Sequence, residues 1–247
     1  MARSLLLRGM MVGLVAGLLV FAFARWAGEP QVDRAIAFET SMDQAKGEPP
    51  EQEMVSRKIQ KGFGLLTGVL VYGTALGGIF GLVFAYARGR LSQSRPRVLS
   101  ALLAGVGFVT IVLIPSLKYP ANPPSVGNPE TIGVRTAAYF LLITISIVVM
   151  VLAIKVRFHW NKSMGEWNAT LMAGILYLVL VSVIAHFLPR IDEVPAEFPA
   201  SLLWKFRIAS WETQAVMWGL LGLLFGWLTE RAERVPQTSH RQILTTS

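Results

Sequence analysis

The chain has 247 residues, of which 53% are hydrophobic and only 15% charged, and its mean hydropathy is +0.51. About a quarter of the residues of a soluble domain are charged, so this composition excludes an ordinary soluble globular domain and favours a lipid bilayer as the solvent. The absence of cysteine excludes a disulfide framework and a thiolate metal site. The net charge of +8 would suggest nucleic-acid binding in a soluble protein, but in this chain the positions of the charges are more informative.

Six apolar segments are close to the length, roughly 20 residues, that crosses a bilayer as a helix. Backbone groups inside hydrocarbon need partners within their own segment, which a helix provides. The alternating pattern of a membrane β-barrel is not seen. The sequence therefore predicts an all-α integral membrane protein with about six transmembrane helices. The predicted segments are Met10–Trp26, Phe63–Ala87, Val98–Leu117, Thr136–Val156, Ala169–Leu188 and Trp211–Thr229.

The first segment allows two readings. Two arginines precede a short apolar run, and the Ala-Phe-Ala at 22–24 resembles a signal-peptidase site, so cleavage would leave five spans. Alternatively the helix is retained, because Gly9, Gly13 and Gly17 repeat every fourth residue, a spacing that lets membrane helices pack closely. Weak internal similarity among the apolar segments further suggests three consecutive helical hairpins, formed by segments one and two, three and four, and five and six.

The distribution of Lys and Arg orients these segments. With six spans, one side of the membrane collects the N-terminus, the loops after the second and fourth segments, and the C-terminus, with twelve basic and three acidic side chains. Short basic loops stay in the cytoplasm, so both termini are expected there if the first span is retained, and the acidic loops are expected outside. We expect residues 1–231 to form the membrane domain and 232–247 to form a polar, disordered cytoplasmic tail.

The proline segment, Leu117–Pro129 ("LKYPANPPSVGNP"), is predicted to be an outer loop. Proline lacks the N–H donor and restricts the residue before it, so the loop cannot be helical but can be rigid. One interpretation is a cap that seals a helical hairpin. The other is a preorganised collar that offers the amides of Asn122 and Asn128 to something passing inward.

Few side chains on this chain carry chemistry. No P-loop, HExxH or GxSxG pattern is present, so ATP hydrolysis by a P-loop, zinc proteolysis and esterase chemistry find no support. His186 lies inside the fifth predicted segment, near its outer end, and an ionisable residue in a span is a functional hypothesis. Asp192 and Glu193 follow soon after. His159 and His240 lie in polar regions and are interpreted as incidental.

Acids gather in the predicted outer loops. Asp33, Glu39, Asp192 and Glu193 would attract cations, and imidazole with carboxylate suits borderline divalent ions. We therefore predict a metal site from six residues, with Asn122 orienting a partly hydrated ion: His186, Asp192, Glu193, Asp33, Glu39 and Asn122. The alternative is ion pairing with nearby bases, among them Arg57 and Arg207.

Four stretches resemble the CbtA family of proposed cobalt transporter subunits: "GEPQVDRAIAFE", "LKYPANPPSVGNPETIGVRTAAYF", "EWNATLMAGILYL" and "FPASLLWKFRIASWETQAVMW". The resemblance extends over about residues 3–231. It implies a bacterial protein of the cytoplasmic (inner) membrane with about five spans, which works beside cobalamin biosynthesis. It also implies a small single-span partner with a histidine-rich end, CbtB, which would supply imidazoles. No family ligand residues are carried over.

The function predicted from the sequence is therefore membrane passage of a divalent metal ion, most of all cobalt. No enzyme activity, no resident cofactor and no nucleic-acid partner are expected. The alternative is a non-transporting membrane scaffold or assembly factor, in which the glycine-rich helices and the proline segment serve only protein contacts. A membrane-embedded enzyme acting on lipid finds little support in lone carboxylates.

Overall fold

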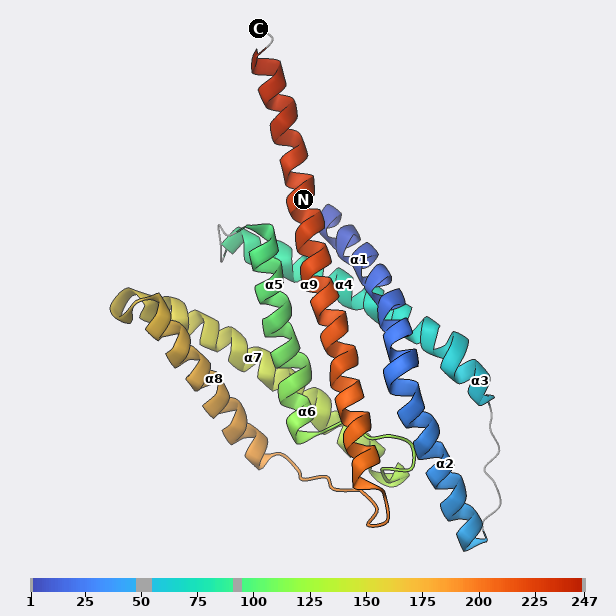
Figure 1. Ribbon diagram of the computed structural model, residues 1–247. Helices are drawn as coiled ribbons and strands as arrows, with labels where there is room; N and C mark the ends of the chain where they lie inside the picture. Colours follow the sequence, from blue (N-terminus) through green and yellow to red (C-terminus); the bar gives the residue numbers. More distant parts are fainter. Residues whose placement is uncertain (1, 48–54, 91–94, 246–247) are drawn as a thin grey trace. The chain divides into compact units, whose positions relative to one another are not determined.

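The computed structural model describes residues 2–47, 55–90 and 95–245, with side chains described as far as Arg234. Helices make up most of these residues, and no β-strand occurs within them, so the prediction of an all-α protein is confirmed (Figure 1). The elements are α1 (Ala2–Phe23), η1 (Ala24–Gly28), α2 (Glu29–Lys46), α3 (Arg57–Ile59), η2 (Gln60–Gly64), α4 (Leu65–Arg90), α5 (Pro96–Gly107), η3 (Phe108–Leu113), α6 (Ile114–Lys118), η4 (Pro129–Thr131), α7 (Ile132–Met164), α8 (Glu166–Phe187) and α9 (Ala200–Thr245).

Among the described residues, five helical stretches are long and apolar enough to cross a membrane. They are Ala2–Lys46, Arg57–Arg90, Pro96–Lys118, Pro129–Met164 and Glu166–Phe187. These five correspond to the first five predicted segments, including the first one, and only Leu188 of the fifth lies beyond its helix. The sixth predicted segment lies inside α9, where Glu212, Gln214 and several glycines and tryptophans lower the average hydropathy, and its crossing of the membrane stays a prediction.

The helices fall into two compact units. Unit 1 consists of Met1–Phe108 and Ile208–Ser247, and unit 2 of Val109–Arg207. The predicted boundary between a membrane domain and a polar tail, after residue 231, falls within α9. It stays a prediction, because the tail's side chains beyond Arg234 lie outside the described part of the chain.

The first helix of unit 1 is much longer than its apolar segment. The helix runs from Ala2 to Lys46, and Gly47 ends it in the left-handed conformation, with φ 72°. The stretch expected to be an acidic outer loop, from Glu29 to Glu39, is therefore helical, and that prediction was wrong. Its one helix breaker, Pro30, is at the start of α2, and the π-turn η1 one turn earlier accommodates the missing N–H.

Glycines bring α1 and α4 into backbone contact within unit 1. A Cβ added to Gly9 would lie 2.0 Å from the carbonyl oxygen of Gly77, and one added to Gly13 would lie 1.9 Å from that of Gly73. A Cβ at Gly81 would meet the Leu5 carbonyl oxygen at 2.4 Å. The prediction that the spaced glycines mediate close helix packing is therefore confirmed for these positions.

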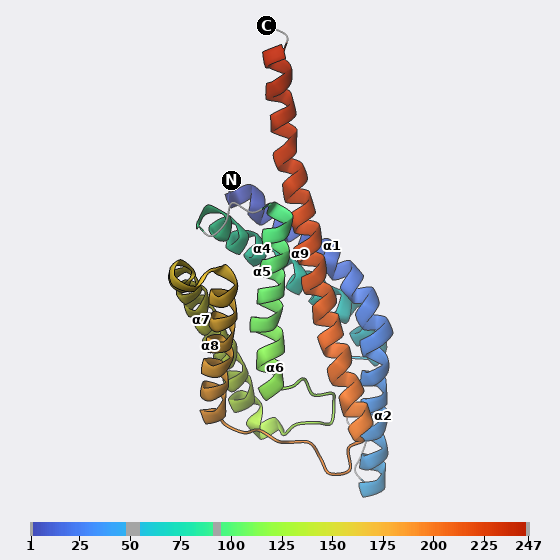
Figure 2. The same ribbon diagram turned by 60° about the vertical axis from the view of Figure 1, so that its left-hand side comes forward.

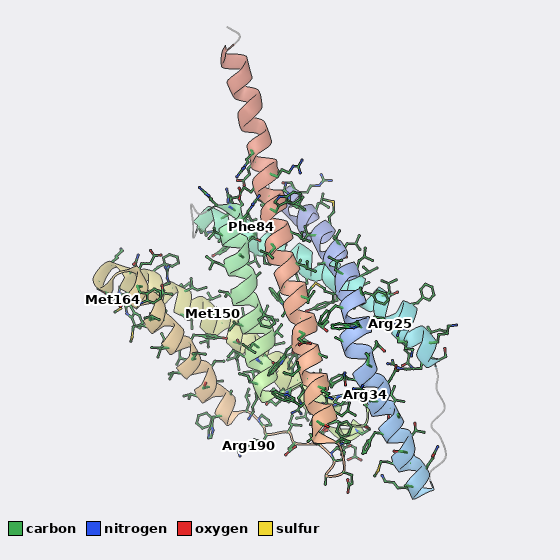
Figure 3. The ribbon with its side chains drawn as sticks, viewed as in Figure 1. Arg25, Arg34, Phe84, Met150, Met164 and Arg190 are labelled. Atoms are coloured by element: carbon green, nitrogen blue, oxygen red, sulfur yellow. The ribbon has the colours of Figure 1, made fainter. Side chains whose placement is uncertain are left out.

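The middle of α9 completes the core of unit 1. Phe225 packs edge-to-face on Phe84 of α4, with ring centroids 5.0 Å apart, and Figure 3 labels Phe84 on that helix. Ser100 of α5 donates a hydrogen bond to the Gly222 carbonyl oxygen at 2.7 Å. A Cβ at Gly107 would lie 2.2 Å from the Trp218 ring. These contacts place α9 against α4 and α5.

The grouping of helices differs from three consecutive hairpins. The first predicted hairpin, α1 with α4, is present in unit 1. The fifth and sixth segments, however, belong to different units, because Met217, Leu221 and Phe225 of α9 are buried in the core of unit 1. The fifth segment, α8, instead packs along α7 in unit 2.

Unit 2 is built on the pair α7 and α8, which lie side by side in Figures 1 and 2. Gly165, at φ 80°, connects the two helices. Their apolar core includes Leu142, Val149, Tyr177 and Val181. A buried polar link crosses it: the Ser146 hydroxyl donates to the Thr110 carbonyl oxygen at 2.8 Å and lies 2.8 Å from the Tyr177 hydroxyl.

Candidate functional site

The first two residues of the proline segment, Leu117 and Lys118, belong to the end of α6, and its last residue, Pro129, begins the short 3-10 helix η4. Residues 119–128 between them contain no helix, as predicted. One turn there is closed by the Val126 N–H, which donates to the Pro123 carbonyl oxygen at 3.2 Å. Ser125, within this turn, has φ 64°, and Gly127, just after it, has φ 133°. A serine with positive φ is uncommon and marks a conformation that the surroundings impose.

Contacts from other parts of unit 2 hold the proline segment at both ends. The Tyr119 hydroxyl donates to the Pro189 carbonyl oxygen at 2.9 Å, and burial raises the pKa of this phenol, which favours its donor form. In the middle, Arg207 donates to the Asn122 side-chain oxygen at 3.1 Å and to the Ala121 carbonyl oxygen at 3.4 Å. These bonds tie the segment to the loop after α8 and to the start of α9.

Glu193 holds the C-terminal end of the proline segment. Its carboxylate accepts hydrogen bonds from the Asn128 N–H at 2.9 Å and from the Thr131 hydroxyl, and it forms an ion pair with Arg135 of α7. Only 12% of the Glu193 side chain is exposed. These contacts lower the pKa of the Glu193 carboxyl below its ordinary value of 4.5. The hydrogen bond from Thr131 has the largest effect, followed by the hydrogen bond from Asn128 and then by the charge of Arg135.

Gly127 allows this arrangement. A Cβ at Gly127 would lie 2.4 Å from a guanidinium nitrogen of Arg135, the base that pairs with Glu193. Any side chain at Gly127 would therefore displace Arg135, in addition to the strain of a positive φ. The glycine thus lets the proline segment and the ion pair occupy the same small space.

The remaining candidates of unit 2 are more accessible. Asp192 is exposed in the loop after α8 and attracts the guanidinium of Arg207 electrostatically. His186 is exposed in the last turn of α8, where its ring packs edge-to-face on Phe187 at 5.6 Å between centroids. Asn122 lies between two prolines of the proline segment, and its side-chain oxygen accepts a hydrogen bond from Arg207.

The other two candidates, Asp33 and Glu39, lie on α2 in unit 1. Asp33 pairs with Arg57 at 3.1 Å and with Lys61 at 3.2 Å, and Glu29 pairs with the same arginine. The two acids and the two bases are each four residues apart, so one face of α2 matches one face of the helix that begins at Arg57. The ion pairing considered as the alternative is therefore observed for Asp33.

A complete metal site is not seen within the described ranges. No group of three or more His, Cys, Asp and Glu side chains there is close enough to hold a metal ion. Three further residues of this region, Arg135, Thr131 and Ser125, were not predicted from the sequence. The hydroxyl oxygen of Ser125 is buried and accepts or donates no hydrogen bond within the described part of the chain. No sequence pattern marks these residues, because each matters only through the folding of the loop.

The fold indicates the class of protein: the described part of the chain is all-α, with five helices that could cross a membrane by length and composition. In the comparison with protein families, residues 2–230 match the family described as probable cobalt transporter subunit, CbtA. Because this match covers nearly the whole chain, the protein belongs to the CbtA family. The comparisons with curated proteins and with solved structures found no match.

Proposed function

We propose that this chain is the membrane-embedded subunit of an uptake system that passes a divalent metal ion, cobalt above all, into the bacterial cytoplasm. The family match over residues 2–230 carries this proposal. The five apolar helices support it, since a conduit needs a multi-pass scaffold. The proposal includes the inner membrane as location and a supply of cobalt to cobalamin biosynthesis, both by family resemblance. It also includes cytoplasmic termini, which the distribution of Lys and Arg favours if the first span is retained. It assigns no enzyme activity.

The accessible candidates are proposed as the first contacts of the ion. Asp192 contributes a carboxylate and His186 an imidazole, ligand types that suit cobalt and nickel. Both are exposed and follow one another closely along the chain, across the end of α8. Glu39 of α2 is proposed as a further acidic contact in unit 1. Transport requires an ion to leave as well as bind, so a few weak contacts serve it better than a closed cage.

The candidates that have hydrogen-bond or ion-pair partners are proposed to fix the positions of the proline segment and of α2. Glu193 and Asn122 hold the proline segment through Asn128 and Arg207, so their part in metal passage is to keep backbone carbonyls and the Ser125 hydroxyl in a fixed place. Oxygen ligands of this kind can replace part of an ion's hydration shell. Asp33, balanced by Arg57 and Lys61, is proposed to fix the orientation of α2 and so to support Glu39.

A second subunit is proposed to complete the transporter. The family is described as a transporter subunit, which implies a partner. The whole chain contains three histidines and no cysteine, so it has few of the ligands that bind cobalt strongly. A small single-span membrane protein with a histidine-rich end, like CbtB, would provide them.

Uptake of radiolabelled cobalt by cells without their own cobalt importers tests this function. Cells expressing the chain alone, the chain with the histidine-rich partner, and neither protein are compared, with nickel or zinc as competitor. We expect uptake above the empty control when both subunits are present. No uptake in any cells, despite confirmed insertion of the chain in the membrane, would instead favour the scaffold function.

A further inference from the structure

A second polar site lies in unit 1 and is formed by residues of α5 and α9. A hollow of about 200 Å³ is lined by Arg97, Trp227, Arg231 and Arg234. Arg97 belongs to the first turn of α5, and the other three belong to α9. Positions 227, 231 and 234 follow one another at helical spacing, so they share one side of α9.

The hollow has an excess of positive charge. Glu230 pairs with both Arg97, at 3.2 Å, and Arg234, and is only 11% exposed. This single carboxylate therefore faces two of the three arginines. Arg231 places its guanidinium 5.5 Å from the centre of the Trp227 ring, and no acidic partner is found for it within the described residues. An anion of one or two charges would balance the site.

Further arginines near the hollow add to its positive charge. Arg8 of α1 donates to the Thr229 hydroxyl at 3.1 Å, and Arg88 of α4 pairs with Glu233 at 2.6 Å. One terminal nitrogen of Arg88 is buried without a hydrogen-bond partner in the described part of the chain. The arginines at 8, 88, 97, 231 and 234 thus outnumber the acids at 230 and 233. Phosphate matches such a cluster, because guanidinium groups bind its oxygens in pairs.

An exposed apolar stripe on α9, formed by Leu223 and Trp227, leads along the helix to Arg231 in the hollow. Leu223, Trp227 and Arg231 succeed one another every four residues along one side of α9, and Leu223 is 68% and Trp227 41% exposed. The order along the helix is therefore an alkyl side chain, an indole and a guanidinium. A phospholipid presents the matching order from its acyl chain through the interface to its phosphate.

We propose that this hollow binds the phosphate group of an anionic phospholipid, with Arg231, Arg97 and Arg234 around the phosphate and an acyl chain along Leu223. Free phosphate shares the headgroup chemistry, but it would make no use of the leucine and the indole. None of the lining residues belongs to the proline segment or to the proposed ion contacts, so this proposal does not rest on the transport of metal.

Native mass spectrometry of the purified full-length chain in detergent tests the proposal. The probes are short-chain phosphatidylglycerol, short-chain phosphatidylcholine and inorganic phosphate. The variants are Arg231→Gln, which leaves the ion pairs of Glu230 intact, and Leu223→Gln, which changes only the apolar stripe. Arg90→Gln is the matched control, because Arg90 also stacks on an aromatic ring, Tyr86 at 4.2 Å, and does not line the hollow.

We expect saturable binding of phosphatidylglycerol that exceeds binding of phosphatidylcholine. Arg231→Gln should weaken it roughly fivefold, as the loss of one cation near a charged lipid predicts. Leu223→Gln should also weaken it, and Arg90→Gln should not. Equal binding of inorganic phosphate, with no effect of Leu223→Gln, would overturn the lipid assignment. Non-saturable lipid binding, or equal losses in Arg231→Gln and Arg90→Gln, would overturn the site itself.

Discussion

The carboxylate of Glu193 accepts a hydrogen bond from the backbone N–H of Asn128, 2.9 Å away, although the two residues are 65 positions apart in the chain. This bond closes the proline segment onto the loop that follows α8. From the sequence, Glu193 was predicted to contact a metal ion, and one interpretation had the Asn128 amide face something passing inward. The structure shows that they bind each other.

Removing the charge of Glu193 should loosen the proline segment. Glu193→Gln keeps an oxygen acceptor for Asn128 but loses the ion pair with Arg135, so the Asn128 amide should exchange its hydrogen faster. Hydrogen-exchange mass spectrometry of the peptide over the proline segment measures this. Glu197→Gln, in an exposed position of the same loop, is the control and should leave exchange unchanged. Equal exchange in all three proteins would show that Glu193 does not hold the loop.

The same anchor should respond to acid. The pKa of Glu193 is lower in the folded protein than its ordinary 4.5, so its stabilisation is complete above that value and declines as the pH falls through the lowered pKa. Exchange of the proline segment, corrected for the intrinsic rate, should therefore accelerate as the pH falls below 4.5 and through the lowered pKa. The Glu193→Gln variant should lack this acceleration. An identical pH dependence in that variant would assign the effect to another group.

Close packing of α1 and α4 should make Gly77 intolerant of a methyl group. Gly77→Ala places a Cβ 2.1 Å from the Gly9 carbonyl oxygen, so the helices must separate, at a cost of about 1–3 kcal/mol in free energy of unfolding. Gly68→Ala is the matched control in the same helix, because its Cβ meets nothing within 4 Å. It should be neutral or stabilise by up to about 1 kcal/mol, since alanine favours the helix. Thermal unfolding in detergent measures both variants, and a Gly77→Ala variant as stable as Gly68→Ala would contradict the packing.

The buried hydroxyl of Ser146 should stabilise unit 2. Ser146→Ala leaves the Thr110 carbonyl oxygen and the Tyr177 hydroxyl without this partner inside an apolar core, at an expected cost of about 1–3 kcal/mol. Thr144→Ala removes a hydroxyl that is exposed on the same helix and bonds only to the helix itself. That control should change the free energy of unfolding little. Similar losses in both variants would remove the special role of the buried link.

Asp192 should affect metal uptake without releasing Asn128 from Glu193. Asp192→Asn removes an exposed carboxylate that accepts none of the hydrogen bonds of the proline segment, so uptake of cobalt should fall while exchange of the Asn128 amide, which Glu193 holds, stays the same. Both are measured at equal abundance of the protein in the membrane. Unchanged uptake would exclude Asp192 as a contact of the ion.

The apolar segments and the glycine spacing were predictable from sequence because both depend on local periodicity. Five predicted segments correspond to helices able to cross a membrane, and Gly9 and Gly13 meet Gly73 and Gly77. The helical state of Glu29–Glu39 was not predicted, since Pro30 and the acids there suggested a loop and a π-turn leaves no clear sequence pattern.

The metal site stays a prediction, and the contacts of its residues were only partly predictable. The sequence placed Glu193 and Asp33 near bases, but it could not choose between metal binding and ion pairing. That choice depends on partners far along the chain, such as Arg135 for Glu193 and Arg57 for Asp33. Long-range pairing of this kind is set by the folding of whole elements, and a single sequence contains no periodic signal for it.

The central claim is that this chain conducts a metal ion, and flux into proteoliposomes tests it most directly. The purified chain is reconstituted with the histidine-rich partner around a trapped fluorophore that cobalt quenches, and empty vesicles and vesicles with the partner alone are the controls. We predict quenching by external cobalt that is faster than in either control and slower with Asp192→Asn. Equal quenching rates in all vesicles, with both subunits confirmed in the membrane, would contradict the proposed function.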